Sequence, residues 1–411
     1  MRCYMTKDEF KKDCLIGAVI QKQITVADCA KRLELSVRQV MRLVAKVKSG
    51  SSLLHGNCGK GAKGLDAKLK QNIVDIYSQF RFADSNFLHF KELLLELHQI
   101  QISYNALRTL LLRAGFASPK KHRPKKNHPR RPPKEAFGEM LQTDASSHQF
   151  FLPFGDQKFY ALHGFIDDAA GAITGLYMTK NECSDGYFEA LRATLLNFGC
   201  PGSVYADGLS LFFSSKREAL SKKDILAGIE ERRTQFGQIC YDLGIELIHA
   251  RSSQAKGKIE RLWQTLQSRL ITEFKIRDID SVEKANAFLP EYLVSFNKKF
   301  SKLVTKSVFL PVPKTIDLNL LLSLKYTRKL DSGLCFSFYK NIFKVPDGTP
   351  HATVELLISK IHGMKVLLKG KLLSVIPLFD ANNNPQVTQN SNRDTIQDIV
   401  KTLLTRNERV A

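Results

Sequence analysis

The sequence lacks the patterns that mark several common classes of protein. Its eight cysteines are scattered, with no CxxC pair and no Cys/His cluster at zinc-ligand spacing. A structural zinc or a disulfide framework is therefore not expected, and thiols of this kind fit a reducing compartment. The sequence also has no apolar run of the roughly eighteen residues that a membrane helix needs. The N-terminal segment MRCYMTKDEFKKDC has no apolar leader region, so we expect a cytoplasmic protein with no membrane partner.

Acidic residues are scarce in the first third of the chain. Residues 1–135 hold 27 Lys and Arg residues against 11 Asp and Glu, so most of the formal net charge of +22 lies there. Such an excess favours a polyanionic partner, most commonly nucleic acid. With 411 residues, 43% of them hydrophobic, the chain is long enough for several domains with real cores. We expect a DNA-binding region attached to a better balanced remainder, and hence a nucleoid-associated protein.

Residues 1–50 have the pattern of a helix-turn-helix DNA-binding domain. A helix over residues 25–33 is followed by a break at residues 34–35 and by Ser36 as the N-cap of a second helix. The second helix is predicted to have an apolar face (Val37, Val40, Met41, Val44) and a polar face (Arg38, Gln39, Arg42, Lys46). We expect Arg38, Arg42 and Lys46 to contact DNA. An ordinary helical hairpin is the alternative.

A second helical DNA-binding domain is predicted for residues 65–117, with Ser103 as the N-cap of its last helix and Arg108 as its expected DNA contact. Residues 118–136 form a Pro-rich basic linker with no helical or strand pattern, suited to following a phosphate backbone. A solvated spacer without a partner is the alternative. The expected DNA contacts in this linker are its cationic side chains: Lys120, Lys121, Arg123, Lys125, Lys126, Arg130 and Arg131.

The pattern changes to alternating strands and helices over residues 137–310. Strands are predicted at residues 139–146, 202–207 and 245–250, with a hairpin at 158–180, helices between them, and a long helix after residue 255. This alternation indicates an α/β layer. Residues 209–232 interrupt it and resemble an insertion. Residues 320–380 predict a small β barrel, and residues 381–411 a mostly disordered tail.

Three acidic residues stand at the ends or starts of these elements. Asp144 and Asp207 end predicted strands, and Glu260 lies in the first turns of the long helix. Carboxylate oxygens suit Mg²⁺ or Mn²⁺, and two such ions could clamp both oxygens of a phosphoryl displacement. The plainer interpretation of Glu260 is an exposed ion pair with Lys256 at i,i+4.

Nearby residues have plain structural interpretations. Asp167 and Asp168 lie at the turn of the predicted hairpin, where Asp is common for backbone reasons. Trp263, the only tryptophan, is expected in the core.

Several ordered blocks resemble the DDE transposases of bacterial insertion sequences, of the ISNCY-type group within the retroviral-integrase superfamily. The blocks are MLQTDAS, FIDDAAG, CPGSVYAD, TQFGQICYDLGIELIHARSSQAKGKIERLWQTLQSRL and ANAFLPEYLVSFNKKF. The resemblance implies an RNase H-like integrase catalytic core in which Asp144, Asp207 and Glu260 bind two Mg²⁺ or Mn²⁺ ions. It also implies DNA contacts around Glu260, at Arg251, Lys256, Lys258 and Arg261. Gly208 and Ala170 depart from the family pattern, which expects a cation after the second Asp and Thr at the latter position.

The function that this resemblance implies is metal-dependent DNA strand cleavage and strand transfer at the ends of an insertion sequence. The partners are then element ends and target DNA, and self-association to a dimer or a larger assembly is expected. Two alternatives stay open at this point. One is a non-catalytic DNA-binding regulator, and the other is a nuclease that cleaves DNA but joins nothing.

Overall fold

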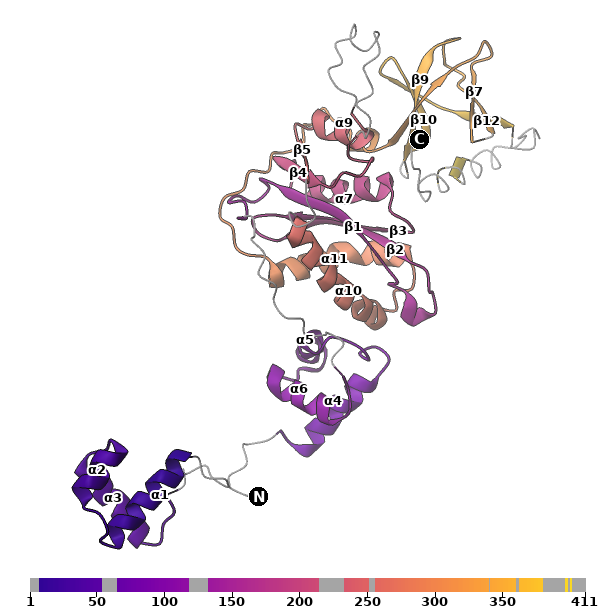
Figure 1. Cartoon of the computed structure of the whole chain (residues 1–411). Coiled ribbons are helices and arrows are strands. Elements are labelled where there is room, and N and C mark those ends of the chain that lie inside the picture. The colour runs from indigo at the N-terminus through magenta and orange to yellow at the C-terminus, as the bar shows by residue number, and fades with distance from the viewer. Residues whose placement is uncertain are drawn as a thin grey trace. The chain divides into compact units, whose positions relative to one another are not determined.

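The computed structural model describes residues 7–53, 65–117, 132–213, 233–250, 256–339, 341–359, 362–379, 396, 397 and 400. The chain divides into two compact units, Met1–Asp75 and Ile76–Ala411 (Figure 1). Each unit is described by itself. Within the described ranges, no helix is long and apolar enough to cross a membrane. The predicted basic linker, the predicted insertion and the tail fall almost wholly outside these ranges.

The first unit contains the expected pair of helices around a short turn. Glu34 adopts the left-handed conformation (φ 57°) after the second helix, and Ser36 caps the third helix through a reciprocal capping box with Gln39. Such caps satisfy amide groups that would otherwise lack partners at the helix start. The helices of this unit are α1 (Lys7–Ile20), α2 (Val26–Leu33) and α3 (Val37–Lys48).

The predicted apolar face of α3 is partly wrong. Val40 is fully buried against Ile16 and Cys29, as predicted. Val37 and Met41, however, are 48% and 60% exposed. The core-facing side of α3 is formed by Val40, Leu43, Val44 and Val47, and Val37 and Met41 lie beyond one edge of it.

Helix α4 (Ala67–Ser78) begins in the first unit and ends in the second. It is followed by α5 (Phe87–His98) and α6 (Tyr104–Arg113), capped by Asn86 and Ser103. Ser103 is the N-cap that the sequence predicts. The Tyr77 ring packs edge-on against Phe87 and Phe90, which gives this helical segment an aromatic centre.

A five-stranded mixed sheet forms the middle of the second unit, in the order β3-β2-β1-β4-β5. β1, β2 and β3 pair antiparallel, whereas β4 pairs in parallel with both β1 and β5. A short 3-10 helix, η1 (Leu152–Phe154), follows β1. The strands are β1 (Leu141–His148), β2 (Tyr160–Asp167), β3 (Ile173–Thr179), β4 (Ser203–Ala206) and β5 (Glu246–His249).

Helices cover both faces of this sheet (Figure 1). On one side lie α7 (Ser184–Asn197) and α9 (Gln235–Asp242), and on the other α10 (Gly257–Arg277) and α11 (Val282–Phe300). Strand β2 contributes to both cores by alternation, with Phe165 packed on the first side and Leu162 and Ile166 on the second. A mixed sheet between two helical layers fits an RNase H-like fold.

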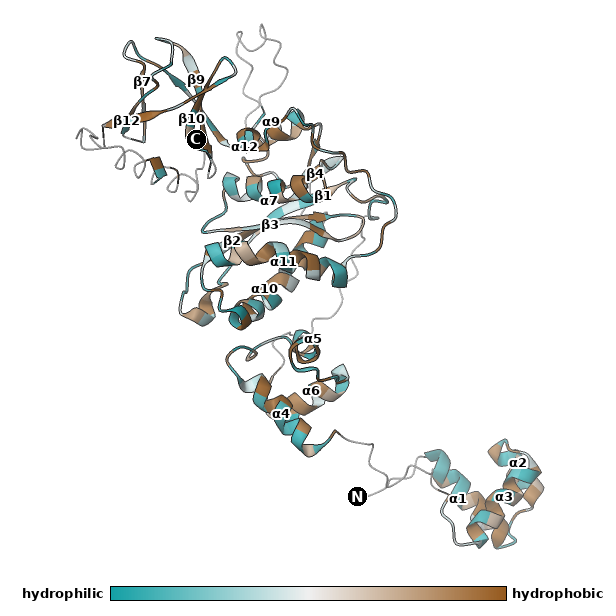
Figure 2. Cartoon of the chain, turned by 180° about the vertical axis from the view of Figure 1, so that it is seen from behind, coloured by the Kyte–Doolittle hydropathy of each residue, from teal (hydrophilic) through white to brown (hydrophobic). Residues whose placement is uncertain are grey.

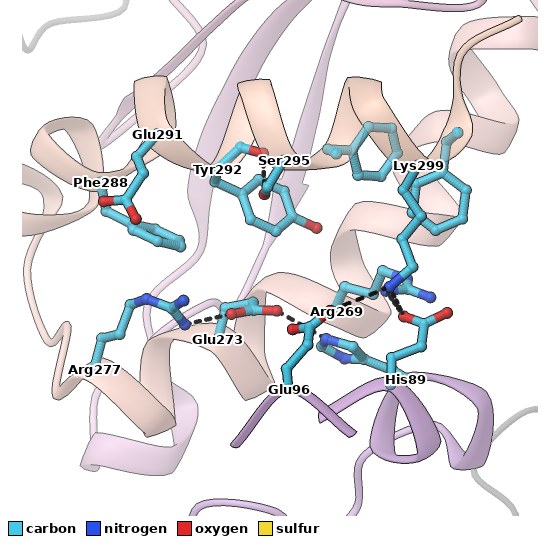
Figure 3. Close-up of a pocket in the computed structure, with 13 residues that line it drawn as sticks. His89, Glu96, Arg269, Glu273, Arg277, Phe288, Glu291, Tyr292, Ser295 and Lys299 are labelled. Carbon is cyan, nitrogen blue, oxygen red and sulfur yellow. Dashed lines mark hydrogen bonds and ion pairs between the residues drawn. The ribbon is translucent and has the colours of Figure 1, made fainter. Parts of the chain in front are cut away.

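Buried ion pairs join α5 to α10 and α11 (Figure 3). The Arg269 guanidinium donates to Glu92 (2.7 Å), and His89 Nε2 lies 2.8 Å from Glu273. These groups line a cavity of about 150 Å³. Burial raises the pKa of Glu273, but the hydrogen bond and charge of His89 and the charge of Arg277 outweigh it, so the pKa of Glu273 is lowered overall.

The C-terminal strands do not confirm the expected closed barrel. The described strands form two open sheets, one ordered β11-β10-β9-β6 and one ordered β12-β8-β7. A short helix, α12 (Leu318–Leu321), precedes them. The strands are β6 (Leu324–Lys329), β7 (Cys335–Phe338), β8 (Asn341–Lys344), β9 (Thr353–Ser359), β10 (Gly363–Leu368), β11 (Lys371–Leu373) and β12 (Ile376–Phe379).

Candidate active site

Asp144 and Asp207 lie on neighbouring strands in matching positions. β1 and β4 pair in parallel with Leu141 opposite Val204 and Gln142 opposite Tyr205. Extending this register by two residues sets Asp144 opposite Asp207, one residue after β4 ends. Asp144 does not end its strand as predicted, because β1 continues to His148. The carboxyl end of β4 nevertheless brings the two acids together, at the edge where α/β sites form.

A buried lysine stands between these two carboxylates. Lys256 Nζ lies 3.1 Å from Asp144 Oδ1 and 3.5 Å from Asp207 Oδ2. Its side chain is only 7% exposed, while those of Asp144 and Asp207 are 24% and 37% exposed. An ammonium removed from water needs such partners, because an unpaired buried charge is costly. The two carboxylates therefore converge on one cationic position.

Helix α10 holds Asp144 from a second point. The Trp263 indole N–H donates to Asp144 Oδ2 at 3.2 Å. Trp263 also packs over Gly164 on β2, where an added Cβ would lie 2.8 Å from the indole ring. Trp263 is a core residue, as the sequence favours, but it also orients a site residue.

Glu260 occupies the same side of α10 as these two residues. Lys256, Glu260 and Trp263 follow one another at i, i+4 and i+7, a spacing that aligns side chains on one helix face. Glu260 is exposed, in the first turn of the helix. Among the described residues, no group of three His, Cys, Asp or Glu side chains is arranged closely enough to hold a metal ion.

The start of α10 is fixed to the sheet by a polar network. The Gln142 amide donates to Asp168 (2.7 Å) and its oxygen accepts from the Ile259 N–H (3.3 Å). Lys258 Nζ lies 3.6 Å from Asp168. Asp167 accepts from the backbone N–H of Gly138. These contacts agree with the backbone roles that the sequence favours for the Asp pair at the hairpin.

Glu182 is a fourth carboxylate near the site that sequence reasoning missed. It precedes α7 and accepts a hydrogen bond of 2.7 Å from the buried Tyr187 hydroxyl. Partial burial, and then the negative charges of Asp144 and Asp207, raise the pKa of Glu182, although the Tyr187 hydrogen bond and Lys256 oppose them. No spacing pattern in the sequence points to it, because Glu182 lies in the loop between β3 and α7 rather than at the end of a strand of the site.

The remaining predicted contact residues are spread over the chain. Arg38, Arg42 and Lys46 are exposed on α3, and Arg108 is exposed on α6. Arg261 is exposed, with its Nε donating to Gly257 O at 2.8 Å. The other expected DNA contacts lie outside the described residues: Lys120, Lys121, Arg123, Lys125, Lys126, Arg130, Arg131 and Arg251.

The fold and the site define a class of protein. An α/β core that fits the RNase H-like fold carries acidic residues on adjacent parallel strands, next to a long helix with a further Glu in its first turn. This combination is what the sequence leads us to expect of an integrase-like catalytic core.

Comparison with known proteins identifies the family. The transposase for insertion sequence IS1202 of Streptococcus pneumoniae is 34% identical over 361 residues, which are 79% of this chain and 76% of that protein. A second relative, y4bF of Sinorhizobium fredii, is also named as a transposase and is 32% identical over 339 residues, 81% of this chain and 72% of its own. No family model matches. The chain belongs to the insertion-sequence transposases and is a DNA transposase.

Two solved structures are also similar. One is the intasome of simian T-cell lymphotropic virus in complex with PP2A regulatory subunit B56 gamma (15% identity, 74% of this chain, 96% of that chain, TM-score 0.31). The other is the HTLV-2 integrase catalytic core domain in complex with magnesium, in a dimeric form (15% identity, 42% of this chain, 94% of that chain, TM-score 0.28). TM-scores of this size add no weight to the family assignment.

Proposed function

We propose that this transposase binds the ends of its insertion sequence and performs strand cleavage and strand transfer through Asp144, Asp207 and Glu260. Cleavage frees a 3′-OH at the element end, and that hydroxyl then attacks a phosphodiester of the target DNA. Both steps are displacements at phosphorus, so a single set of carboxylates can serve both.

The observation that carries this proposal is the convergence of Asp144 and Asp207 on one cation. The two strands pair in parallel register, and the Lys256 ammonium lies 3.1 Å from Asp144 and 3.5 Å from Asp207. These contacts support a cation site between the two carboxylates. Hard oxygen donors of this kind match Mg²⁺ or Mn²⁺. Glu260, aligned on α10 between Lys256 and Trp263, would complete the ligand set.

Two divalent metal ions would neutralise charge at the reacting phosphate and make a bound water more acidic. The chain's own residues have separate tasks. Trp263 keeps Asp144 in one orientation, and Gln142 ties the start of α10 to β1. Lys256, once released from the aspartates, can pair with a DNA phosphate, as can the exposed Arg261.

DNA recognition is assigned to the helical segments. The exposed cations of α3 (Arg38, Arg42, Lys46) and Arg108 of α6 would bind the element ends, with the basic linker tracking phosphates between the domains. Cutting two ends together requires two active sites. We therefore propose that the chain acts as a dimer or a larger assembly on DNA.

A cleavage and strand-transfer assay tests this function. The substrate is end-labelled duplex carrying the gene's own flanking DNA, incubated with Mg²⁺ or Mn²⁺. The wild-type chain is compared with Glu260→Gln and with Glu283→Gln, which alters an exposed glutamate of α11. We expect 3′-end nicks and joined products from the wild type and from the control, and neither from Glu260→Gln.

The other possible results would each lead to a different conclusion. Undiminished cleavage by Glu260→Gln would remove Glu260 from the site. Specific binding without cleavage by any of the three chains would favour a DNA-binding regulator. Cleavage that never yields joined products would favour a nuclease.

A further inference from the structure

Helix α3 exposes two apolar side chains that lie outside the core of its own unit. Val37 is 48% exposed and Met41 is 60% exposed, whereas Val40 is fully buried. The partly buried residues that pack with Val40 are Leu43, Val44 and Val47, so the core-facing side of α3 is complete without the other two. Val37 and Met41 are spaced i,i+4 and share one outward face. Figure 2 shows that the helices of this unit carry both hydrophobic and hydrophilic stretches.

Cationic side chains flank this exposed pair. Arg38 and Arg42 each follow one of the apolar residues, and both are exposed. Lys46 and Lys48 lie in the last turn, and α3 contains no acidic residue. An outward apolar stripe bordered only by positive charge suits a polyanion that also presents apolar groups, rather than a membrane or an apolar protein groove.

Gln39 is not available to read bases, although its type would suit that task. Its side-chain oxygen accepts from the Ser36 backbone N–H at 2.9 Å, and its own N–H donates to Ser36 Oγ at 3.3 Å. This capping box commits the Gln39 side chain to the start of the helix. The outward residues of the first two turns are therefore Val37, Arg38, Met41 and Arg42.

The major groove of B-DNA presents one apolar group at its base edges, the 5-methyl of thymine. We propose that Val37 and Met41 are specificity-determining residues that contact thymine methyl groups in the element end, while Arg38 and Arg42 bind adjacent phosphates or guanine edges. This inference rests on the proposed binding of element ends. It adds which bases are read and by which side chains.

Replacing thymine by uracil in the DNA removes the methyl group and leaves base pairing unchanged. Binding of the full-length chain is measured by fluorescence anisotropy on the element-end duplex, with each dT replaced in turn by dU. Loss of one buried methyl group should weaken binding by about four-fold. For the wild type we expect this loss of affinity when dU replaces one or two of the thymines. In Met41→Ala and in Val37→Ala, one of these thymines should no longer be distinguished from uracil.

Phe10→Ala is the matched control, since Phe10 is 61% exposed in the same unit but on α1. It should keep the full preference for thymine over uracil. Wild-type binding that ignores every dU, or a preference that survives unchanged in Met41→Ala and Val37→Ala, would overturn the inference. In either case the cleavage assay still tests the proposed function, because strand cleavage with undisturbed end binding would leave transposition standing.

Discussion

Removing the ammonium of Lys256 should strengthen metal binding while weakening the metal-free fold. Lys256 contacts Asp144 and Asp207 at 3.1 Å and 3.5 Å, so a divalent ion that takes both carboxylates has to displace it. In Lys256→Met the side chain keeps its length and burial but loses the charge. The two aspartates then face each other without a counter-ion until metal binds.

The structure bounds the size of this effect. Hydrogen bonds to charged groups contribute about 1.5–3 kcal/mol, but the two aspartates are 24% and 37% exposed, and water screens them. A loss of about 1–2 kcal/mol in the free energy of unfolding without metal is therefore reasonable. Because Lys256→Met removes the ammonium that competes with the metal, metal binding should tighten by roughly 5- to 30-fold.

Two measurements check this prediction. Calorimetric titration with Ca²⁺ or Mg²⁺ in the absence of DNA gives the metal affinity, and thermal melts with and without metal give the stability. Lys258→Met is the control, since Lys258 pairs with Asp168 at 3.6 Å and not with the two converging aspartates. Its metal affinity should stay at the wild-type value. If Lys256→Met bound metal no more tightly than the wild type, Lys256 would not compete for the site.

Three further predictions concern neighbouring groups. Trp263→Phe loses the donor to Asp144 and part of the packing on Gly164. DNA cleavage should fall about ten-fold and the free energy of unfolding should drop by about 1–3 kcal/mol, as kinetics and denaturant titration would reveal. A Cβ at Gly208 would lie 2.7 Å from Nε2 at the tip of the exposed His249 side chain. This ring can turn away, so Gly208→Ala should leave the melting temperature nearly unchanged, and a clear drop would show that the His249 ring is held in place. The lowered pKa of Glu273 means that its stabilisation is complete above its ordinary value of 4.5 and is lost as pH falls through the lower folded value. Hydrogen exchange in α5 should thus rise only below about pH 4.5, and a rise of equal size in Glu273→Gln would refute this assignment.

The parts of the fold that local signals control could be predicted from the sequence. Ser36 and Ser103 cap the helices they were expected to cap, because capping depends on side chains within three residues. Asp207 follows its strand as predicted, since the apolar run before it ends there. Glu34 likewise forms the expected break. Each of these features is set by its immediate neighbours in the chain.

Features that depend on long-range packing could not be predicted. Which side of α3 faces the core is decided by contacts with Ile16 and Cys29, and periodicity alone put Val37 and Met41 on the wrong side. The position of Lys256 between the aspartates joins segments 112 residues apart. Glu182 likewise comes from a separate segment of the chain, so no motif around it could have indicated its place.

The contacts at the start of α10 imply that metal and DNA bind in a coupled way. The buried Lys256 brings a cation to Asp144 and Asp207, and Trp263 brings a hydrogen-bond donor to Asp144. A divalent ion and the Lys256 ammonium cannot both neutralise Asp144 and Asp207 at the same contacts. Loading the site would therefore free a lysine beside the reacting phosphate, so metal binding and DNA binding should each favour the other. The affinity of the wild-type chain for its end DNA should rise when Ca²⁺ is present, and this gain should shrink in Lys256→Met but persist in Lys258→Met.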